Sequence, residues 1–392
     1  MSVALVLAVA TVLAWGVLVV ARAGFWRIER PERFPDPARW PDVVAVIPAR
    51  DEAESIGQTV ASLLDQDYPG RLSVVVVDDQ SADGTARVAL EAASGREDRL
   101  ALVAGAPLPS GWTGKVWAME QGVAHADIWA AGAEYVLFTD ADIRHAPGQV
   151  RALVARAEAR RLDLASLMVR LHCATLPERA LIPAFVHFFR MLYPFRLIAD
   201  PASRVAGAAG GVMLARRQAL AAIGGLAALK GALIDDCTLA ARIKEQGGRL
   251  WLGLADETVS LRVYRGWGEP WAMIARSAYD QLGHSPLALL GTVLAMALVF
   301  VAPPVLVAAG LVSGGGSATI IAAIAWEMMA ATYLPMVRFY RLPAAWALAL
   351  PAVSLVYLGA TVHSAWNYHR GRGGRWKGRI EGGRTGTGGA AS

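Results

Sequence analysis

Apolar residues are distributed along the chain in two ways, and each way predicts a different kind of structure. Residues 2–21 form an uncharged run, and three more apolar runs cover 286–312, 318–337 and 343–365. Each run is long enough for a helix to span a bilayer. Residues 40–270 instead alternate short apolar runs with helical patterns. We therefore expect a membrane region at each end of the chain and a folded domain in the middle.

The middle part is predicted to alternate strands with helices. Strands are expected at 43–49, 72–77, 100–104 and 136–138, and helices near 54–65, 85–93 and 116–124. This spacing indicates a parallel sheet whose two faces are covered by helices. Ligands of such sheets gather beyond the carboxyl ends of the strands. The residues that follow the strands are therefore the first candidates for a site.

Two aspartates, Asp140 and Asp142, come directly after the fourth predicted strand. In an extended segment their side chains project from the same face. Carboxylates at that spacing repel each other unless a cation lies between them. Hard oxygen ligands suit Mg²⁺ or Mn²⁺, which can in turn hold the two phosphates of a nucleotide. A loop with two solvated aspartates is the alternative, and the rest of the chain decides between the two.

Polar residues also follow the first two predicted strands. The segment 48–54 contains no Gly-x-Gly-x-x-Gly, which argues against a nicotinamide dinucleotide site. After the second strand, Asp78 and Asp79 can accept hydrogen bonds from a base and a ribose. Asp83 can cap the next helix and Gly84 permits the turn. A capped turn without a ligand is the alternative for this second segment.

A lysine at the start of a predicted helix is another candidate. Lys115 follows Gly111-Trp112-Thr113-Gly114, but the first glycine of a Walker motif is missing at the required spacing and a valine follows the lysine. A lysine at a helix start can still pair with a phosphate. Lysines on loops are usually solvated, so this residue alone is weak evidence.

Three later segments add candidates. The small residues of 207–211 lead into a strand and allow the backbone to approach a ligand closely. Asp235 and Asp236 open a helix, where their charge is favourable. Capping explains one of them, and the second is a candidate general base. Aromatic residues and arginines alternate through 177–200, which indicates an interfacial helix or, alternatively, an ordinary amphipathic surface helix.

Composition narrows the class of protein. The chain has 392 residues, 55% of them hydrophobic, and a formal net charge of +5. The basic residues cluster near the apolar ends, where anionic lipid headgroups explain them. No basic stripe interleaved with aromatics occurs in the middle part, so we expect no nucleic-acid partner. Cys173 and Cys237 lie far apart without metal-ligand spacing, and neither a disulfide nor a zinc site is indicated.

The flanks of the first apolar run predict its orientation. Ala21-Arg22-Ala23 resembles a signal-peptide cleavage site, but no basic segment precedes the run, whereas several arginines follow it. We prefer an uncleaved anchor with its N-terminus outside, in a multi-pass protein of the cell inner (cytoplasmic) membrane whose catalytic domain is cytosolic. Four spans would leave the basic tail outside, so one C-terminal segment is expected to be re-entrant or interfacial. Glu327, inside an apolar run, should face protein or water.

Five motifs in this order resemble family 2 glycosyltransferases of the GT-A fold. They are Ile47-Pro48-Ala49-Arg50-Asp51-Glu52, Asp78-Asp79-Gln80-Ser81-Ala82-Asp83-Gly84-Thr85, Gly114-Lys115, Asp140-Ala141-Asp142 and Asp235-Asp236 with Leu239. More narrowly, 112–118, 231–237 and the apolar segments that follow resemble the hopene-associated glycosyltransferases, the HpnB group. The five motifs span roughly residues 43–245, and the narrower resemblance covers nearly the whole chain.

The resemblance implies an α/β GT-A nucleotide-sugar-binding fold with a mainly parallel sheet and transmembrane helices at both ends. The expected divisions are a membrane anchor at 1–35, a catalytic domain at 40–270, a C-terminal membrane region at 271–366 and a basic glycine-rich tail at 367–392. The implied activity is inverting transfer of a sugar from a nucleotide-diphosphate donor, a UDP-sugar first of all. The implied acceptor is a membrane lipid related to hopanoids.

The resemblance also implies roles for individual residues. Asp236 would be the catalytic base, and Asp142 with Asp140 would hold a divalent metal, Mg²⁺ or Mn²⁺. The substrate-binding residues would be Pro48, Asp51, Glu52, Asp78, Asp79, Lys115, Asp140, Gly210, Gly211 and Asp235.

Two departures from the family pattern bear on the acceptor. Asp235-Asp236 replaces the usual Glu-Asp pair, and the Gln-x-x-Arg-Trp motif of processive relatives is absent where 275–281 reads Ala-Arg-Ser-Ala-Tyr-Asp-Gln. A single transfer to a lipid is therefore favoured over chain extension. Polyprenyl phosphate, ceramide and diacylglycerol remain alternative acceptors. An inactive scaffold or transporter is the alternative from a different class, with Glu327 its only support.

Overall fold

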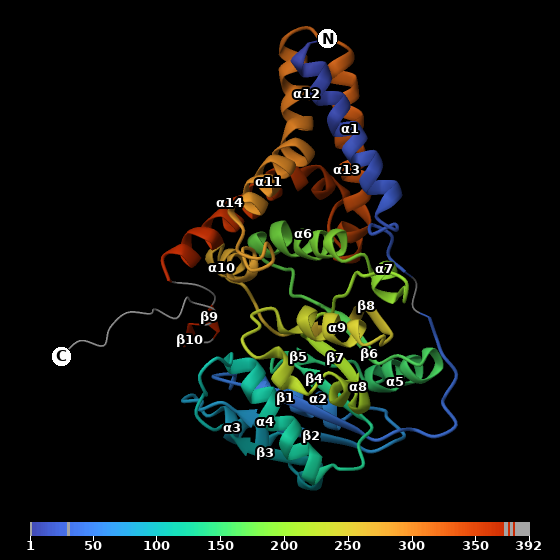
Figure 1. Cartoon of the computed structure of the whole chain (residues 1–392), viewed down its shortest axis with the longest axis vertical. Coiled ribbons are helices and arrows are strands. Elements are labelled where there is room, and N and C mark those ends of the chain that lie inside the picture. Colours follow the sequence, from blue (N-terminus) through green and yellow to red (C-terminus); the bar gives the residue numbers. More distant parts are fainter. Residues whose placement is uncertain (1, 30–31, 372–374, 377–378, 381–392) are drawn as a thin grey trace, which may run out of the picture.

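The computed structural model describes residues 2–29, 32–371, 375–376 and 379–380. Along the long axis of the molecule, a sheet covered by helices lies at one end and apolar helices project from the other, with α6 between them (Figure 1). Most of the predicted basic tail, 367–392, and Arg30 lie outside the described residues.

Eight strands form one sheet in the order β3-β2-β1-β4-β7-β6-β8-β5. Strands β1 to β4 are parallel, whereas β7 runs antiparallel to both of its neighbours. The mainly parallel GT-A sheet that was predicted is confirmed. The bounds are β1 Val43–Ala49, β2 Leu72–Asp78, β3 Leu100–Ala104, β4 Tyr135–Thr139, β5 Ile143–Arg144, β6 Leu164–Arg170, β7 Val212–Arg216 and β8 Leu250–Ser260.

Alternating side chains of the sheet pack against two different sets of helices. In β1, Val44 and Val46 join the core of one face, while Ala45 and Ile47 join the core of the other, as period-two alternation requires. Every residue of β1 is buried, which explains its uninterrupted apolar run. The first face carries α4 (Gly114–Trp129) and α9 (Asp235–Glu245); the second carries α2 (Ile56–Leu64), α3 (Thr85–Glu91) and α5 (Gln149–Arg160).

Helix α6 (Leu176–Leu192) forms the middle layer with the short α7 (Phe195–Ala199). It begins with a capping box in which the Thr175 side chain and Glu178 satisfy each other's backbone N–H groups. The amphipathic surface helix considered for this segment is not found, because apolar helices of the C-terminal region cover α6. The Tyr357 hydroxyl, for example, donates to the Leu181 carbonyl oxygen at 2.8 Å.

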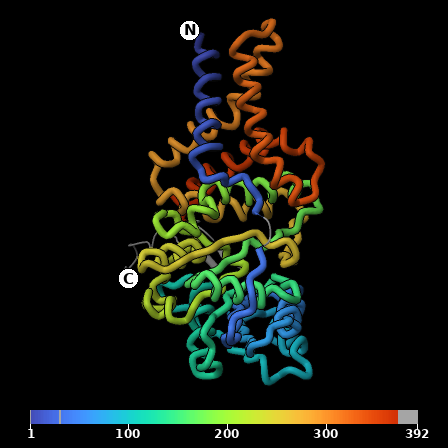
Figure 2. Tube along the Cα trace, turned by 90° about the vertical axis from the view of Figure 1, so that its right-hand side faces the viewer, coloured from blue at the N-terminus to red at the C-terminus, as the bar shows by residue number. Residues whose placement is uncertain are grey.

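Among the described residues, four helical segments are long and apolar enough to cross a membrane: Val3–Ala21, Pro286–Val312, Ser317–Phe339 and Ala344–His369. The first is α1. The second combines α11 (Pro286–Met296) and α12 (Ala302–Val312) around a π-helical turn, the third is α13, and the fourth contains α14 (Leu350–His369). Helices α1, α12 and α13 form the projecting bundle, with the N-terminus at its far tip (Figures 1 and 2). Helix α14 instead runs across the base of the bundle (Figure 1).

Two charged residues, Arg22 and Glu327, lie next to or within these apolar helices. The Arg22 guanidinium, just after α1, donates to the carbonyl oxygens of Met191 and Leu192 at 2.7 and 2.9 Å and so caps the end of α6. Glu327 in α13 is exposed rather than packed against another helix. The expectation that it faces protein or water rather than lipid therefore stays a prediction.

Candidate active site

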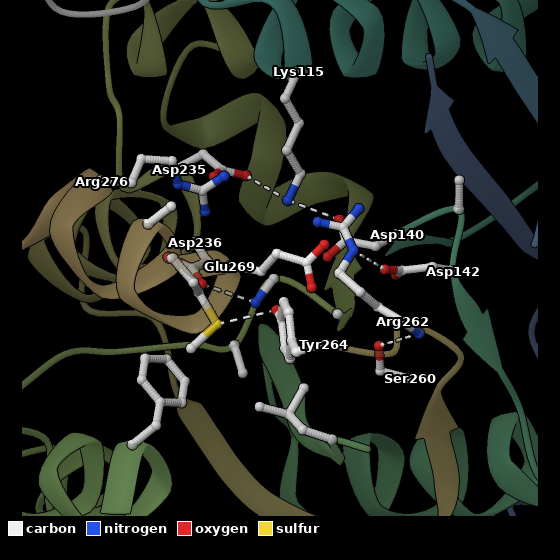
Figure 3. A pocket seen from close by; sticks show the side chains of 18 of the residues that line it. Lys115, Asp140, Asp142, Asp235, Asp236, Ser260, Arg262, Tyr264, Glu269 and Arg276 are labelled. Atoms are coloured by element: carbon white, nitrogen blue, oxygen red, sulfur yellow. Dashed lines mark hydrogen bonds and ion pairs between the residues drawn. The ribbon is translucent and has the colours of Figure 1, made fainter. Parts of the chain in front are cut away.

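A cavity of about 1260 Å³ lies between the carboxyl ends of the strands and the layer of α6, α10 (Gly268–Ser277) and α14. Figure 3 shows that charged side chains from several elements converge on it. Ten acidic residues line the cavity, against four lysines or arginines. An anionic ligand such as a diphosphate therefore needs additional positive charge to bind here.

The two aspartates after β4 both line the cavity but have different partners. Asp140 pairs with the Lys115 ammonium at 2.9 Å, and Asp142 pairs with Nε of Arg262 at 3.1 Å. They follow the strand in a turn, not in the extended segment that was expected. Burial and the neighbouring Asp140 carboxylate raise the pKa of Asp142 to about 6. This site therefore attracts cations.

Lys115 links two of the predicted motifs. Besides Asp140, its ammonium lies 3.4 Å from Asp235 Oδ2, an ion-pair distance without the geometry of a hydrogen bond. Burial opposes the charge of Lys115, but the carboxylates of Asp140 and Asp235 outweigh it, and its pKa is raised. The lysine stays protonated and holds the start of α4 to the turn after β4 and to the start of α9.

Asp236 is held by two backbone N–H groups. Its Oδ2 accepts from Gly210 at 2.8 Å and its Oδ1 from Cys237 at 2.7 Å. Burial, followed by the neighbouring Asp235, raises the pKa of Asp236 to about 6, although Lys115 opposes the shift. A buried carboxyl that titrates near neutrality has the properties of a general base.

Gly210 must be small for this arrangement. A Cβ atom at this position would lie 3.1 Å from Lys115 Nζ and 3.3 Å from Asp236 Oδ2. Gly211 packs against β6 and accepts a hydrogen bond from the Thr139 hydroxyl at 2.8 Å through its carbonyl oxygen. Both glycines line the cavity, as the run of small residues suggested.

The loops after β1 and β2 are joined by reciprocal hydrogen bonds. Asp51 Oδ1 accepts from the Ala82 N–H, and Asp83 Oδ2 accepts from the Ala53 N–H, both at 2.9 Å. Asp51 has a φ of +50°, a strained conformation for a non-glycine residue that the surrounding structure has to maintain. Pro48, Asp51 and Glu52 line the cavity.

Asp78 and Asp79 do not line the cavity. Asp79 is fully buried, and its carboxylate lies 3.7 Å from the Arg50 guanidinium. Asp78 Oδ1 accepts from the Ser81 N–H at 3.1 Å and closes the turn after β2. Both side chains therefore stabilise the loop from outside the cavity, as the alternative of a capped turn without a ligand predicts.

Sequence reasoning missed Arg262, which lies at the centre of the site (Figure 3). Besides Asp142, its guanidinium contacts Glu52 at 3.4 Å. Arg262 follows β8, so the rule that sites gather at the carboxyl ends of strands could have found it. The strand itself was not recognised, because Asp256 and Glu257 interrupt its apolar pattern.

The residues present fit a hard divalent cation only in part. Within the described ranges, no group of three or more His, Cys, Asp or Glu side chains converges as a metal site. Asp142 and Asp140 supply carboxylate oxygens, the ligand type that Mg²⁺ and Mn²⁺ prefer, and Mg²⁺ usually takes its other ligands from water and substrate phosphates. The two-carboxylate set therefore fits a metal that arrives with a phosphorylated ligand.

Comparison with known proteins finds one family model that matches part of the chain and solved structures of similar fold. Residues 44–224 match the family model for Glycosyl transferase family 2. No curated protein sequence matches the chain. The chain is similar to the solved mannosyltransferase PcManGT from Pyrobaculum calidifontis in complex with GDP-Man and Mn²⁺, with 24% identity and a TM-score of 0.56 over 93% of this chain and 99% of that one. This likeness shows the fold.

Two further structures are more distant. Glucosyl-3-phosphoglycerate synthase from Mycobacterium tuberculosis, in complex with Mg²⁺ and uridine diphosphate, has 18% identity and a TM-score of 0.39 over 69% of this chain and 82% of that one. S. aureus TarS 1–349 in complex with UDP has 14% identity and a TM-score of 0.39 over 88% and 97%. Residues 44–224 thus match the family model for Glycosyl transferase family 2, and the chain has a fold of the GT-A type.

Proposed function

We propose that this chain is a membrane-bound, inverting glycosyltransferase that moves one sugar from a nucleotide-diphosphate donor, a UDP-sugar first of all, to a hydroxyl group of a membrane lipid. The observation that carries the proposal is the convergence of Asp236, Lys115 and the Asp140–Asp142 turn on one cavity. A candidate base and a candidate cation site thus border the same space, as a glycosyl transfer requires.

The donor would lie along the carboxyl ends of the strands. The joined loops after β1 and β2 give Asp51 and Glu52 to the nucleoside side of the cavity. The diphosphate would lie beside Asp140 and Asp142, because a divalent cation there offsets the excess of carboxylates. When bound, such an ion would neutralise charge on the departing diphosphate. Lys115 would keep the Asp140 carboxylate fixed and add a second positive charge.

The acceptor hydroxyl would lie at Asp236. A hydroxyl group is a poor nucleophile until its proton is removed in the transition state. The two N–H donors of Gly210 and Cys237 fix the carboxylate, and its raised pKa lets it hold the proton that it takes. Asp235, bound to Lys115, would orient the site rather than accept that proton.

A lipid acceptor is favoured by the four apolar helices. The finer proposal of a hopanoid-related lipid rests on the resemblance of 112–118 and 231–237 to hopene-associated glycosyltransferases. We also propose the division into an anchor at 1–35, a catalytic domain at 40–270 and a membrane region at 271–366. Metal use is supported by the solved relatives, since PcManGT was solved with GDP-Man and Mn²⁺.

Two measurements test this function. Isothermal titration of UDP with Mn²⁺ should show metal-dependent binding that Asp142→Asn weakens, whereas Asp256→Asn, an exposed aspartate on β8 outside the cavity, should leave it unchanged. Incubation with labelled UDP- and GDP-sugars and total membrane lipid should then yield a labelled lipid. Equal UDP affinity and metal dependence in the wild type and Asp142→Asn would contradict the donor site, and failure to transfer any sugar would favour a scaffold.

A further inference from the structure

We propose that the membrane-facing wall of the cavity, between α6, α10 and α14, is the binding site for the hydrocarbon chain of the acceptor lipid. The inference rests on the proposed function and adds the place and the chemical class of the second ligand. Large apolar side chains are concentrated on this wall, beside Glu269 and Arg276 of α10, whereas carboxylates dominate the sheet side. Its side chains include Phe185 and Phe189 of α6, Trp271 and Met273 of α10, and Leu171 and Val263.

The size of the cavity leaves room for two ligands. Sites for a single small ligand typically enclose about 300–1,000 Å³, and this cavity encloses about 1260 Å³. The donor proposed above uses the strand ends, where the charged residues are. The apolar wall on the opposite side remains without a role in donor binding, although it makes up a large part of the lining.

A helix that is apolar enough to cross a membrane builds part of this wall. His363, Ser364 and Tyr368 of α14 line the cavity. The Trp271 indole N–H donates to His363 Nδ1 at 2.9 Å, and the Tyr279 N–H donates to the Ser364 hydroxyl at 3.1 Å, so α10 and α14 form one continuous surface. Large apolar side chains, among them Trp366, are exposed elsewhere on α14. A lipid chain that lies on the exposed apolar side chains of this helix is therefore next to the cavity.

The apolar wall continues to the candidate base. The Phe189 ring contacts the Tyr193 ring, with 5.0 Å between centroids. Tyr193 in turn packs at Gly207, where an added Cβ would lie 3.1 Å from its ring. Gly207 is three residues before Gly210, whose N–H holds Asp236. Phe189 and Asp236 both line the cavity, so a chain that lies along Phe189 would have its polar end in the space that Asp236 borders.

Photolabelling of the full-length protein tests the site. The protein is placed in phosphatidylcholine vesicles that contain hexadecanol carrying a diazirine, irradiated, digested and analysed by mass spectrometry. We expect adducts within 185–189 or 271–275 that excess unlabelled hexadecanol suppresses. Ala272→Trp places an indole ring in the apolar part of the cavity and should reduce this labelling about tenfold, since overpacking excludes a ligand. Ala352→Trp, at an exposed alanine of α14 outside the lining, is the matched control and should leave it unchanged.

The outcomes separate this inference from the proposed function. Adducts confined to the exposed faces of α1, α12 and α13, while the same preparation binds UDP with Mn²⁺, would overturn the lipid site alone. Competable adducts in the cavity without any UDP binding would support the lipid site and contradict the glycosyltransferase. If Ala272→Trp fails to bind UDP, Ala275→Phe replaces it, because Ala275 also lines the cavity. Labelling that neither variant reduces would also overturn the proposal.

Discussion

At the scale of single residues, Asp235 and Asp236 are adjacent in sequence but differ in their environment. Asp235 faces the Lys115 ammonium, whereas Asp236 accepts two backbone hydrogen bonds and titrates near pH 6. The difference arises because successive residues at a helix start point in different directions. One carboxylate can therefore be neutralised by a salt bridge while its neighbour stays available for proton transfer.

Asp236→Asn should lower kcat by about 10²- to 10⁴-fold, the usual contribution of a general base. UDP affinity should stay close to that of the wild type, because the proposed donor site lies at Asp51, Glu52 and the Asp140–Asp142 turn and does not include Asp236. Asp235→Asn should cost less turnover, since it weakens only the contact with Lys115. Single-turnover rates and UDP titration of the two variants measure these effects. Near-normal kcat in Asp236→Asn with intact UDP binding would place the base elsewhere.

The raised pKa of Asp236 predicts the acid side of the pH profile. The base must be ionised to act, so activity is present above pH 6 and falls about tenfold per pH unit below it. The profile should be measured at saturating Mn²⁺, with donor binding followed in parallel, because Asp142 titrates in the same range. The residual activity of Asp236→Asn should lack this acid limb. An unchanged limb in that variant would assign it to another group.

Gly210→Ala should reduce activity about tenfold or more, because the new methyl group crowds both Lys115 and Asp236. Gly148→Ala is the matched control, since a Cβ at Gly148 meets no atom within 4 Å. Activity and thermal unfolding of both variants should be compared. Equal activity of the two variants would mean that Lys115 and Asp236 can move apart to accommodate the added methyl group without loss of function.

At the scale of elements, Glu178 connects the middle layer to the active site. It is fully buried at the start of α6, and its carboxylate accepts from the Thr175 N–H at 2.9 Å and from the Tyr264 N–H at 2.7 Å. Burial alone would raise the pKa of Glu178, but these bonds and the one with His172 lower it to about 2. The carboxylate thus fixes the segment that carries Arg262 against the helix.

Glu178→Gln should destabilise the protein by about 1–3 kcal/mol, because an amide cannot replace all the acceptor positions of the carboxylate. It should also raise KM for the donor, since Arg262 loses its fixed backbone. Glu91→Gln, which alters only an exposed pair with Arg87, is the control and should change neither quantity. Thermal unfolding and donor KM are the measurements. A loss of stability without a change in KM would show that Glu178 has no positioning role.

The sequence predicted those elements whose local pattern is unambiguous. Strands β1 and β3 have the predicted bounds, because the apolar run of β1 ends at the polar Arg50-Asp51 and that of β3 ends at Gly105, which breaks a strand. Asp140, predicted from its strand end, and Lys115 and Asp236, predicted from their helix starts, all line one cavity. The burial of Asp79 could not be predicted in this way, because it depends on the contact between Asp79 and Arg50, which lie on different loops. The partner of Asp142 was missed for a similar reason, since β8 contains charged residues on its exposed positions.

At the scale of the whole molecule, composition predicted four apolar helices but not their directions. Helix α14 is as apolar as a spanning helix, yet it packs on α6 and α10 and contributes to the cavity wall. Residues such as His363 and Tyr368 that border a cavity lined by carboxylates do not lie in hydrocarbon. We infer that α14 rests at the membrane surface on the catalytic side, and that α1, α11–α12 and α13 are the three spans.

With three spans, the N-terminus and the end of α14 lie on opposite sides of the membrane. Four spans would put both outside, which disagrees with the basic residues that follow α14. The charges agree: Arg22, Arg338 and Arg341 lie at the ends of α1 and α13, and Arg370 follows α14, whereas 313–317, which join α12 to α13, have no charge. In a variant with Cys173 and Cys237 replaced by serine, an impermeant maleimide added to intact spheroplasts should therefore label Ser313→Cys but neither Ser94→Cys, in the catalytic domain, nor Arg370→Cys. All three should react after permeabilisation, which controls for accessibility. Labelling of Arg370→Cys in intact spheroplasts, with Ser94→Cys protected, would show that α14 crosses the membrane after all, while labelling of Ser94→Cys would reverse the orientation of the whole protein.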